Sequence, residues 1–205
     1  DDALRHPDLL RKGPFVETLP DFHKAGSLRD LVAEGLLHPD FSYLDEREFT
    51  RPLHRHQDKA IRAIVGRNEN LVMATGTGSG KTECFLYPIL NSLLNETDLA
   101  RPGVRALLVY PLNALANDQL YKRLVPLFVG RFAHAGIRVG RFTGLTRKDQ
   151  SRTQAEDEAL ATEPFFKTPP PDGLGWKSVP ENWLLTRDEM LRTPPHILIT
   201  NYAML

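Results

Sequence analysis

A glycine-rich turn that ends in Lys-Thr constrains the fold of this chain more than any other feature. Residues 75–82 read Thr-Gly-Thr-Gly-Ser-Gly-Lys-Thr, after the apolar run 70–74 and at the start of the apolar stretch 81–94. Glycines allow a backbone to wrap until several N–H groups face one anion, and the following helix adds the positive end of its dipole. The pattern predicts a strand, a phosphate-binding turn and a helix in succession, although Thr75 stands where the usual first glycine would be.

Each part of the turn has an expected role. The phosphates are expected to be held by a loop made of Thr75, Gly76, Thr77, Gly78, Ser79 and Gly80. Lys81 would reach the outer phosphates as a point charge, and the Thr82 hydroxyl would bind a Mg²⁺ ion that bridges them. The turn therefore predicts a site for ATP or GTP with Mg²⁺, in which Lys81 and Thr82 are the catalytic residues. The alternative is a glycine-rich turn whose lysine is simply exposed.

Short apolar strands alternate with helices along the chain. This alternation is typical of α/β proteins with a parallel sheet and helices on both faces. Strands are predicted at residues 70–74, 105–110, 137–142 and 196–200, and helices at 27–34 (capped by Ser27), 57–65, 81–94, 113–125 and 186–192. Residues 1–50 are expected to form an N-terminal extension, mostly loop with one short helix, before a domain over 51–205. Residues 145–185, rich in proline and glycine, are predicted to be an irregular insertion.

The composition is that of a folded domain. The chain has 205 residues, 41% of them hydrophobic, and 26 basic against 26 acidic residues, which excludes a disordered tail. No apolar run approaches the ~18 residues of a membrane span, so no membrane partner is expected. The single cysteine fits a cytoplasmic location. The missing initiator Met, and an end directly after an apolar run, suggest a piece of a longer protein.

Basic charge is concentrated in the middle of the chain. Residues 101–153 carry ten basic and two acidic side chains. A clustered positive surface suits the phosphate backbone of a nucleic acid. Solvated charges on helices and loops are the alternative.

Four further segments resemble motifs of the superfamily-two helicases. Arg55-His56-Gln57 with Ala60-Ile61 resembles the glutamine motif, Tyr110 to Gln119 is similar to motif Ia, Phe142-Thr143-Gly144 to motif Ib, and Ile199-Thr200-Asn201 to motif Ic. The resemblance implies that Gln57 reads adenine and so selects ATP over GTP, and that the other turns contact the backbone of a nucleic acid. The contacts expected are Pro111, Asn113, Arg123, Arg141, Thr143, Gly144, Thr200 and Asn201. For each turn taken alone, a residue that caps the next helix is an alternative.

The turn and these motifs together resemble the first RecA-like domain of DEAD/DEAH-type helicases, in the form found in large bacterial DNA-repair and anti-phage defence helicases. The resemblance implies an ATP-dependent helicase or translocase that acts on DNA rather than RNA. The partners it implies are nucleic acid, a second RecA-like domain in the same parent chain, and other defence or repair subunits. Two alternatives are a duplex DNA translocase or remodeller that separates no strands, and a non-catalytic nucleotide-binding scaffold module of a defence complex.

The acidic DExH or DExD box that this family uses to hydrolyse ATP is not identified. Asp157-Glu158-Ala159-Leu160 is rejected, because the polar residues 151–154 before it cannot form the buried strand that must aim the carboxylates. An acidic patch on a solvated helix is the more natural interpretation. The box is expected after Leu205, and the 205 residues alone are expected to be inactive.

Overall fold

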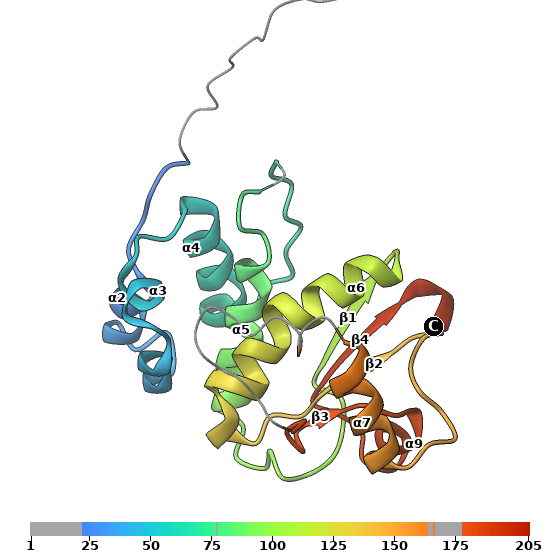
Figure 1. Ribbon diagram of the computed structural model, residues 1–205. Helices are drawn as coiled ribbons and strands as arrows, with labels where there is room; N and C mark the ends of the chain where they lie inside the picture. The colour runs from blue at the N-terminus through green and yellow to red at the C-terminus, as the bar shows by residue number, and fades with distance from the viewer. Residues whose placement is uncertain (1–21, 77, 164–165, 167–177) are drawn as a thin grey trace, which may run out of the picture.

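The fold is built on a parallel sheet. The computed structural model describes residues 22–76, 78–163, 166 and 178–205. Within these residues the strands pair in parallel in the order β1-β4-β2-β3 (Figure 1), and they are β1 (Ala106–Tyr110), β2 (Val139–Phe142), β3 (Trp183–Leu184) and β4 (Ile197–Asn201). Ile197 of β4 aligns with Ala106 of β1 and with Val139 of β2. The predicted α/β class is confirmed, as are the strands predicted at 105–110, 137–142 and 196–200.

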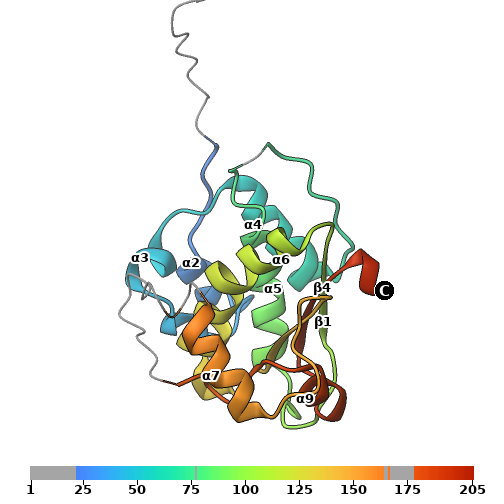
Figure 2. The same cartoon turned by 45° about the vertical axis from the view of Figure 1, so that its right-hand side comes forward.

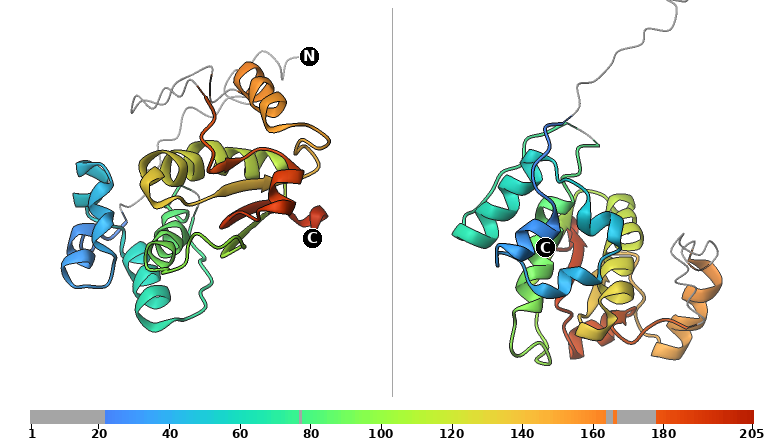
Figure 3. Two further views of the ribbon diagram at one scale, coloured as in Figure 1. Left: turned by 90° about the horizontal axis from the view of Figure 1, so that it is seen from below. Right: turned by 90° about the vertical axis from the view of Figure 1, so that its left-hand side faces the viewer.

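Helices cover both faces of the sheet. The helix α6 (Asn113–Gln119) continues directly into the π-helical segment η4 (Leu120–Arg131), and Figure 3 shows this long helix along one face. Arg141 of β2 points to that face, where its guanidinium donates to Asn117. The preceding residue, Gly140, approaches Met190 of α9 (Arg187–Arg192). Because successive residues of a strand point to opposite faces, α6–η4 and α9 lie on opposite sides of the sheet.

The strand predicted at 70–74 is wrong. These residues form no strand, and Val72 is 92% exposed. A strand has no hydrogen bonds of its own and forms only beside a partner. β1 pairs with β4 on one side, and no strand of the described residues pairs with its other side. The apolar run therefore remains a loop, and Leu107 and Val109 of β1 are exposed.

The described part of the N-terminal region is more helical than expected. It contains α2 (Leu28–Ala33), the 3-10 helix η2 (Pro39–Tyr43) and α3 (Glu46–Thr50), followed by α4 (Arg55–Ile61) and its continuation η3 (Arg62–Gly66). Ser27 caps α2 as predicted, in a capping box with Asp30. Phe41 and Tyr87 are buried edge to face, which packs this region on α5 (Glu83–Leu94). Figure 2 shows α2 and α3 on the side of the molecule remote from β1 and the C-terminus.

The segment predicted as an irregular insertion contains a helix. α7 (Arg152–Thr162) begins with a capping box between Ser151 and Gln154, and its buried residues are alanines. Trp183 of β3 is buried and stacks on Phe166, which ties the end of the segment to the domain. Residues 164–165 and 167–177 of the predicted insertion lie outside the described residues. Short 3-10 turns, η5 (Ala133–Ala135) and η6 (Tyr202–Met204), follow η4 and β4.

None of the helices in the described ranges is long and apolar enough to cross a membrane.

Candidate nucleotide pocket and nucleic-acid edge

The glycine-rich turn lines a pocket of about 380 Å³, here named the phosphate-loop pocket, whose size is typical of small-molecule sites. Gly78 and Gly80 have φ angles of +72° and +75°, in the left-handed region that glycine enters without steric cost. The backbone N–H groups of residues 78–82 donate to no acceptor among the described residues. Unpaired amides at the start of α5 suit the turn to an anion. Thr77, another predicted binding residue, lies outside the described residues.

Lys81 lies over the turn and not in the protein core. Its Nζ donates to the carbonyl oxygens of Thr75, at 2.8 Å, and Gly76, at 2.6 Å. An ammonium group has three N–H donors, so one is left for a ligand. Phosphate oxygens are charged and compete well with neutral carbonyl oxygens for such donors. The hydroxyls of Thr75 and Ser79, 2.8 Å apart, close the base of the turn.

Thr82 lines the same pocket as Lys81. Its hydroxyl is an oxygen ligand of the kind that Mg²⁺ accepts together with water and phosphate oxygens. The residues present therefore fit a magnesium ion that is held mainly by the nucleotide. No group of three or more His, Cys, Asp or Glu residues that could hold a metal ion occurs in the ranges that the structure describes.

Gln57 is fixed between α4 and the turn. It is 1% exposed, its Oε1 accepts from the His54 N–H at 2.9 Å, and its Nε2 donates to the Gly80 oxygen at 3.0 Å. One N–H and one lone pair of the amide remain, which is the combination that reading an adenine edge requires. Gln57 belongs to the wall of the phosphate-loop pocket. Its contact with adenine stays a prediction.

Two histidines beside Gln57 also reach the turn, and the sequence analysis missed both. His56 Nε2 donates to the Ser79 carbonyl oxygen at 2.7 Å. His54 lines the pocket and stacks on His56, with ring centroids 5.4 Å apart. Burial lowers the pKa of His54, and the charge of Lys24 acts in the same direction, so the ring is neutral at pH 7. The only sequence signal was the spacing of His54 and Gln57, which form a capping box at the start of α4.

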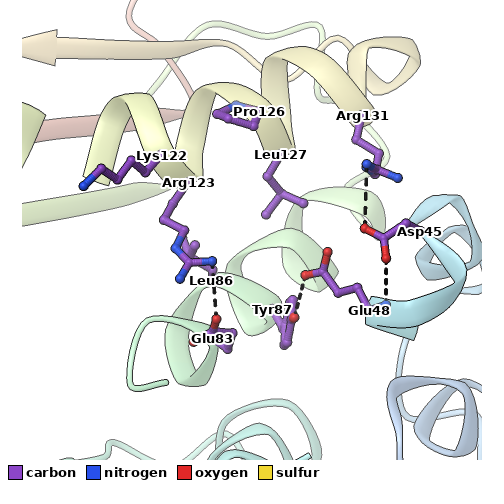
Figure 4. A pocket seen from close by; sticks show the side chains of 10 residues that line it. All are labelled: Asp45, Glu48, Glu83, Leu86, Tyr87, Lys122, Arg123, Pro126, Leu127 and Arg131. Atoms are coloured by element: carbon purple, nitrogen blue, oxygen red, sulfur yellow. Dashed lines mark hydrogen bonds and ion pairs between the residues drawn. The ribbon is translucent and has the colours of Figure 1, made fainter. Parts of the chain in front are cut away.

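Three cations and one carboxylate line the phosphate-loop pocket. Arg51, Lys81 and Arg123 are the cations, and Glu83 is the carboxylate. Arg123 extends from η4 and its guanidinium lies 3.6 Å from Glu83 Oε1, as Figure 4 shows. Arg51 was missed because it reaches the pocket only through the packing of α3 on α5, where Tyr87 donates to Glu48. Glu83 was missed although it directly follows Thr82 in the sequence. The surplus of positive charge favours a polyanion.

A second group of predicted residues gathers at the carboxyl ends of the strands, here named the strand edge. Asn201, at the end of β4, donates from Nδ2 to Asn113 Oδ1, at the start of α6, at 2.6 Å. Thr200 donates its hydroxyl to the Phe142 oxygen, which joins the ends of β4 and β2. Pro111 is exposed beside Asn113. Open α/β sheets bind ligands at this edge, so the structure brings the predicted motifs together where a ligand can meet them.

The turn after β2 is organised by two threonines. Thr143 is fully buried, and its N–H donates to Thr146 Oγ1 at 2.8 Å. The Thr146 hydroxyl donates in turn to the Arg141 carbonyl oxygen. Gly144 is exposed, with open space around its Cα. Thr143 therefore shapes the turn. Of the two predicted residues Thr143 and Gly144, only Gly144 can be reached by a ligand.

Arginines surround the strand edge, although one predicted arginine is not among them. Arg141 donates to Asn117 Oδ1 at 2.6 Å, and Arg187 of α9 donates to the Thr143 oxygen at 2.8 Å while its guanidinium lies 5.1 Å from the centre of the Phe142 ring. Arg187 was missed because its place depends on the packing of α9 on β2. Arg123 follows Asn113 by ten residues, roughly 15 Å along the helix, and lies in the phosphate-loop pocket instead.

Asp157 and Glu158, which were rejected as the acidic box, lie on α7, and residues 151–154 form no strand. Glu158 pairs with Arg147 at 3.3 Å and does not line the phosphate-loop pocket. The pair is therefore placed as the sequence analysis expected, on a solvated helix.

Comparisons with known proteins identify relatives of this chain. The model of the DEAD/DEAH box helicase family matches residues 54–169. The Druantia protein DruE of Escherichia coli is 30% identical over 98% of this chain, and the ATP-dependent RNA helicase ROK1 of Lodderomyces elongisporus is 30% identical over 67% of it. A crystal structure of the DUF1998 helicase MrfA bound to DNA and AMPPNP matches 89% of the chain, with a TM-score of 0.49 and 23% sequence identity. The chain spans 15% of the length of DruE, 24% of ROK1 and 18% of the MrfA chain.

The family match includes the phosphate-loop turn and part of the strand edge. It covers more than half of the chain and contains the glycine-rich turn, Gln57, Asn113 and the turn after β2. The similarity to DruE extends this match over nearly the whole sequence. This chain belongs to the DEAD/DEAH box helicase family.

Proposed function

We propose that residues 51–205 form the first RecA-like motor domain of a helicase or translocase that uses ATP and Mg²⁺ to move along or unwind DNA. The observation that carries this proposal is the phosphate-loop pocket, where unpaired amides of residues 78–82 lie beside Lys81 and a surplus of positive charge. Membership of a helicase family supports the coupling of such a site to nucleic acid. A second RecA-like domain and a cytoplasmic location belong to the same proposal.

In this proposal the phosphate-loop pocket binds the nucleotide and the strand edge binds the nucleic acid. The turn binds the triphosphate, Lys81 neutralises its outer phosphates, and the Thr82 hydroxyl binds Mg²⁺. When bound, the Mg²⁺ neutralises charge that develops on the phosphate oxygens. Gln57 selects adenine from the pocket wall. Asn113 and Gly144 contact the phosphate backbone at the strand edge, which fixes the position of the strand without reading its sequence.

DNA is proposed as the nucleic acid because the motifs resemble those of bacterial DNA-repair and defence helicases. The similarity to DruE of Escherichia coli, over 98% of the chain, adds a bacterial relative to this resemblance. The basic side chains between residues 101 and 153 supply the charge that a phosphate backbone requires.

The variant Lys81→Ala, made in the complete protein, tests the proposal. We expect ATP-driven strand separation and ATP turnover to be lost, while binding to DNA stays largely intact and salt-sensitive. Lys122→Ala is the matched control, because Lys122 is 71% exposed, pairs with Asp118 and does not line the phosphate-loop pocket. Undiminished turnover in Lys81→Ala would contradict the proposal. ATP turnover that duplex DNA stimulates without strand displacement would identify a duplex translocase instead.

A further inference from the structure

We propose that Arg123 is a second cationic contact to the phosphates of the nucleotide, and that without nucleotide it is held at the pocket by a loose pairing with Glu83. The inference rests on the proposed function. It assigns Arg123 to the nucleotide, whereas the sequence analysis expected this arginine to contact the nucleic acid. Arg123 would thus act together with Lys81, from a different element of the fold.

The position of Arg123 is the first observation. It extends from η4, whereas the turn that it meets, residues 75–82, belongs to the loop before α5 and ends 41 residues earlier in the chain. Both line the phosphate-loop pocket. The Arg123 side chain is 52% exposed, and none of the described residues accepts a hydrogen bond from its guanidinium. Its N–H donors, five in a planar fork, are therefore available to an incoming anion.

The state of Glu83 is the second observation. Its side chain is 13% exposed, and its Oε2 is buried without a hydrogen-bond partner. A buried carboxylate is costly unless a cation stays near it, which explains why Arg123 is held at the pocket. The separation of 3.6 Å from Arg123 is too long for a strong hydrogen bond. A phosphate group, which can accept two parallel N–H bonds from a guanidinium, is the better partner for that fork.

The neighbouring lysine shows that this placement is specific. Lys122 precedes Arg123 on the same helix and carries the same charge, but it pairs with Asp118 and does not line the phosphate-loop pocket. Figure 4 shows Arg123 pointing toward Glu83 and Lys122 pointing away from it. Both side chains line the neighbouring pocket that Figure 4 draws, but only Arg123 also lines the phosphate-loop pocket, so only Arg123 reaches the nucleotide.

The test is the affinity of the complete protein for mant-ATP with Mg²⁺, measured by fluorescence titration. Arg123→Gln is expected to weaken binding roughly five- to twentyfold, the range for the loss of one charge-assisted contact at a partly exposed site. Lys122→Gln is expected to leave the affinity unchanged. Competition by adenosine, which has no phosphate, is expected to be the same in all three proteins.

Two further variants make the test decisive. Arg123→Met keeps the apolar stem of the side chain, so it decides the question if Arg123→Gln unfolds, and it is expected to weaken binding equally. Glu83→Gln removes a negative charge beside the phosphates and is expected to bind mant-ATP at least as tightly as the unaltered protein.

The failure of this inference and the failure of the proposed function give different results. Unaltered mant-ATP affinity in a folded Arg123 variant, together with weakened DNA binding, would overturn the inference. It would show that Arg123 contacts the nucleic acid and not the nucleotide. Unaltered affinity in Lys81→Ala would overturn the proposed function itself.

Discussion

Three glycines of the phosphate-binding turn allow its shape to be tested in graded steps. An alanine at Gly76 would meet nothing within 4 Å and has no left-handed φ to adopt. At Gly78 the surroundings are equally open, but φ is +72°. At Gly80 φ is +75° and the new methyl group would collide with Gln57 Nε2. Gly76→Ala is therefore a control, Gly78→Ala adds backbone strain, and Gly80→Ala adds both backbone strain and a collision.

The expected losses follow from these surroundings. An L-residue held in the left-handed region costs about 1–2 kcal/mol. The unbound turn of Gly78→Ala relaxes to avoid this strain, and binding of ATP must restore it, so the expected loss of ATP affinity is about 5- to 30-fold. Gly80→Ala also displaces Gln57, whose hydrogen bonds to the Gly80 oxygen and from the His54 N–H contribute about 1 kcal/mol each. Its loss of affinity is then expected to exceed about 100-fold. Gly76→Ala is expected to bind ATP like the unaltered protein.

Titration with mant-ATP and Mg²⁺ measures the three affinities, and thermal unfolding shows whether each variant is folded. The order of affinities, Gly76→Ala above Gly78→Ala above Gly80→Ala, is the result that the structure requires. Equal losses in all three variants, or a Gly80→Ala protein that binds like Gly76→Ala, would show that ATP binds to a turn of a different shape.

Three other predictions address the strand edge, the packing of the N-terminal region and the cysteine. Arg141→Gln is expected to reduce the slope of log affinity for DNA against log salt concentration by about one, measured by fluorescence anisotropy; an unchanged slope would leave Arg141 a structural partner of Asn117. Tyr87→Phe removes a hydrogen bond of 2.7 Å to Glu48 and is expected to lower the free energy of unfolding by about 1.5–3 kcal/mol, measured in urea; unaltered stability would contradict the value of this contact. Burial raises the pKa of the Cys84 thiol to about 11, so at pH 8 only about one thiol in a thousand is ionised. Alkylation of Cys84 by iodoacetamide is therefore expected to be slow in the folded protein, to rise with pH toward 11, and to be fast after unfolding; rapid labelling of the folded protein at pH 7 would contradict it.

The elements found from sequence are those that a local pattern determines. The apolar runs of β1, β2 and β4 form a parallel sheet, and the glycines before Lys81 mark the glycine-rich turn wherever the neighbouring strands lie. Residues 70–74 carry the same local signal as β1. A strand also needs a partner, and partners depend on how distant segments pack, which periodicity cannot reveal.

The helix α7 was missed for the opposite reason. It has hardly any apolar face, since its buried residues are Ala155 and Ala159, so hydrophobic periodicity gave no signal. The spacing of Ser151 and Gln154, which form a capping box, was the available indication.

Some residues of the site could also be predicted from a local pattern, and others depend on packing. The turn and Gln57 were recognised from their spacing. The strand edge was anticipated because parallel strands end on one side of a sheet, and the contact between Asn113 and Asn201 shows that two of its motifs meet there. Arg51 and Arg123 could not be assigned to the nucleotide or to the nucleic acid from the sequence. A count of basic residues indicates that the chain favours phosphate, but it does not show which of these two ligands each side chain meets.

The long helix that follows β1 contributes to both sites, with its first residue at one and a residue near its middle at the other. Its first residue, Asn113, is bonded to Asn201 at the strand edge, and Arg123 faces Glu83 in the phosphate-loop pocket. A hydrogen-bonded helix packed against a sheet slides as a rod, typically by about 1–2 Å, because a close-packed interior does not deform gradually. A shift of Arg123 along the helix axis would therefore also move Asn113, the residue proposed to contact the nucleic-acid backbone, and no segment between the two would have to refold.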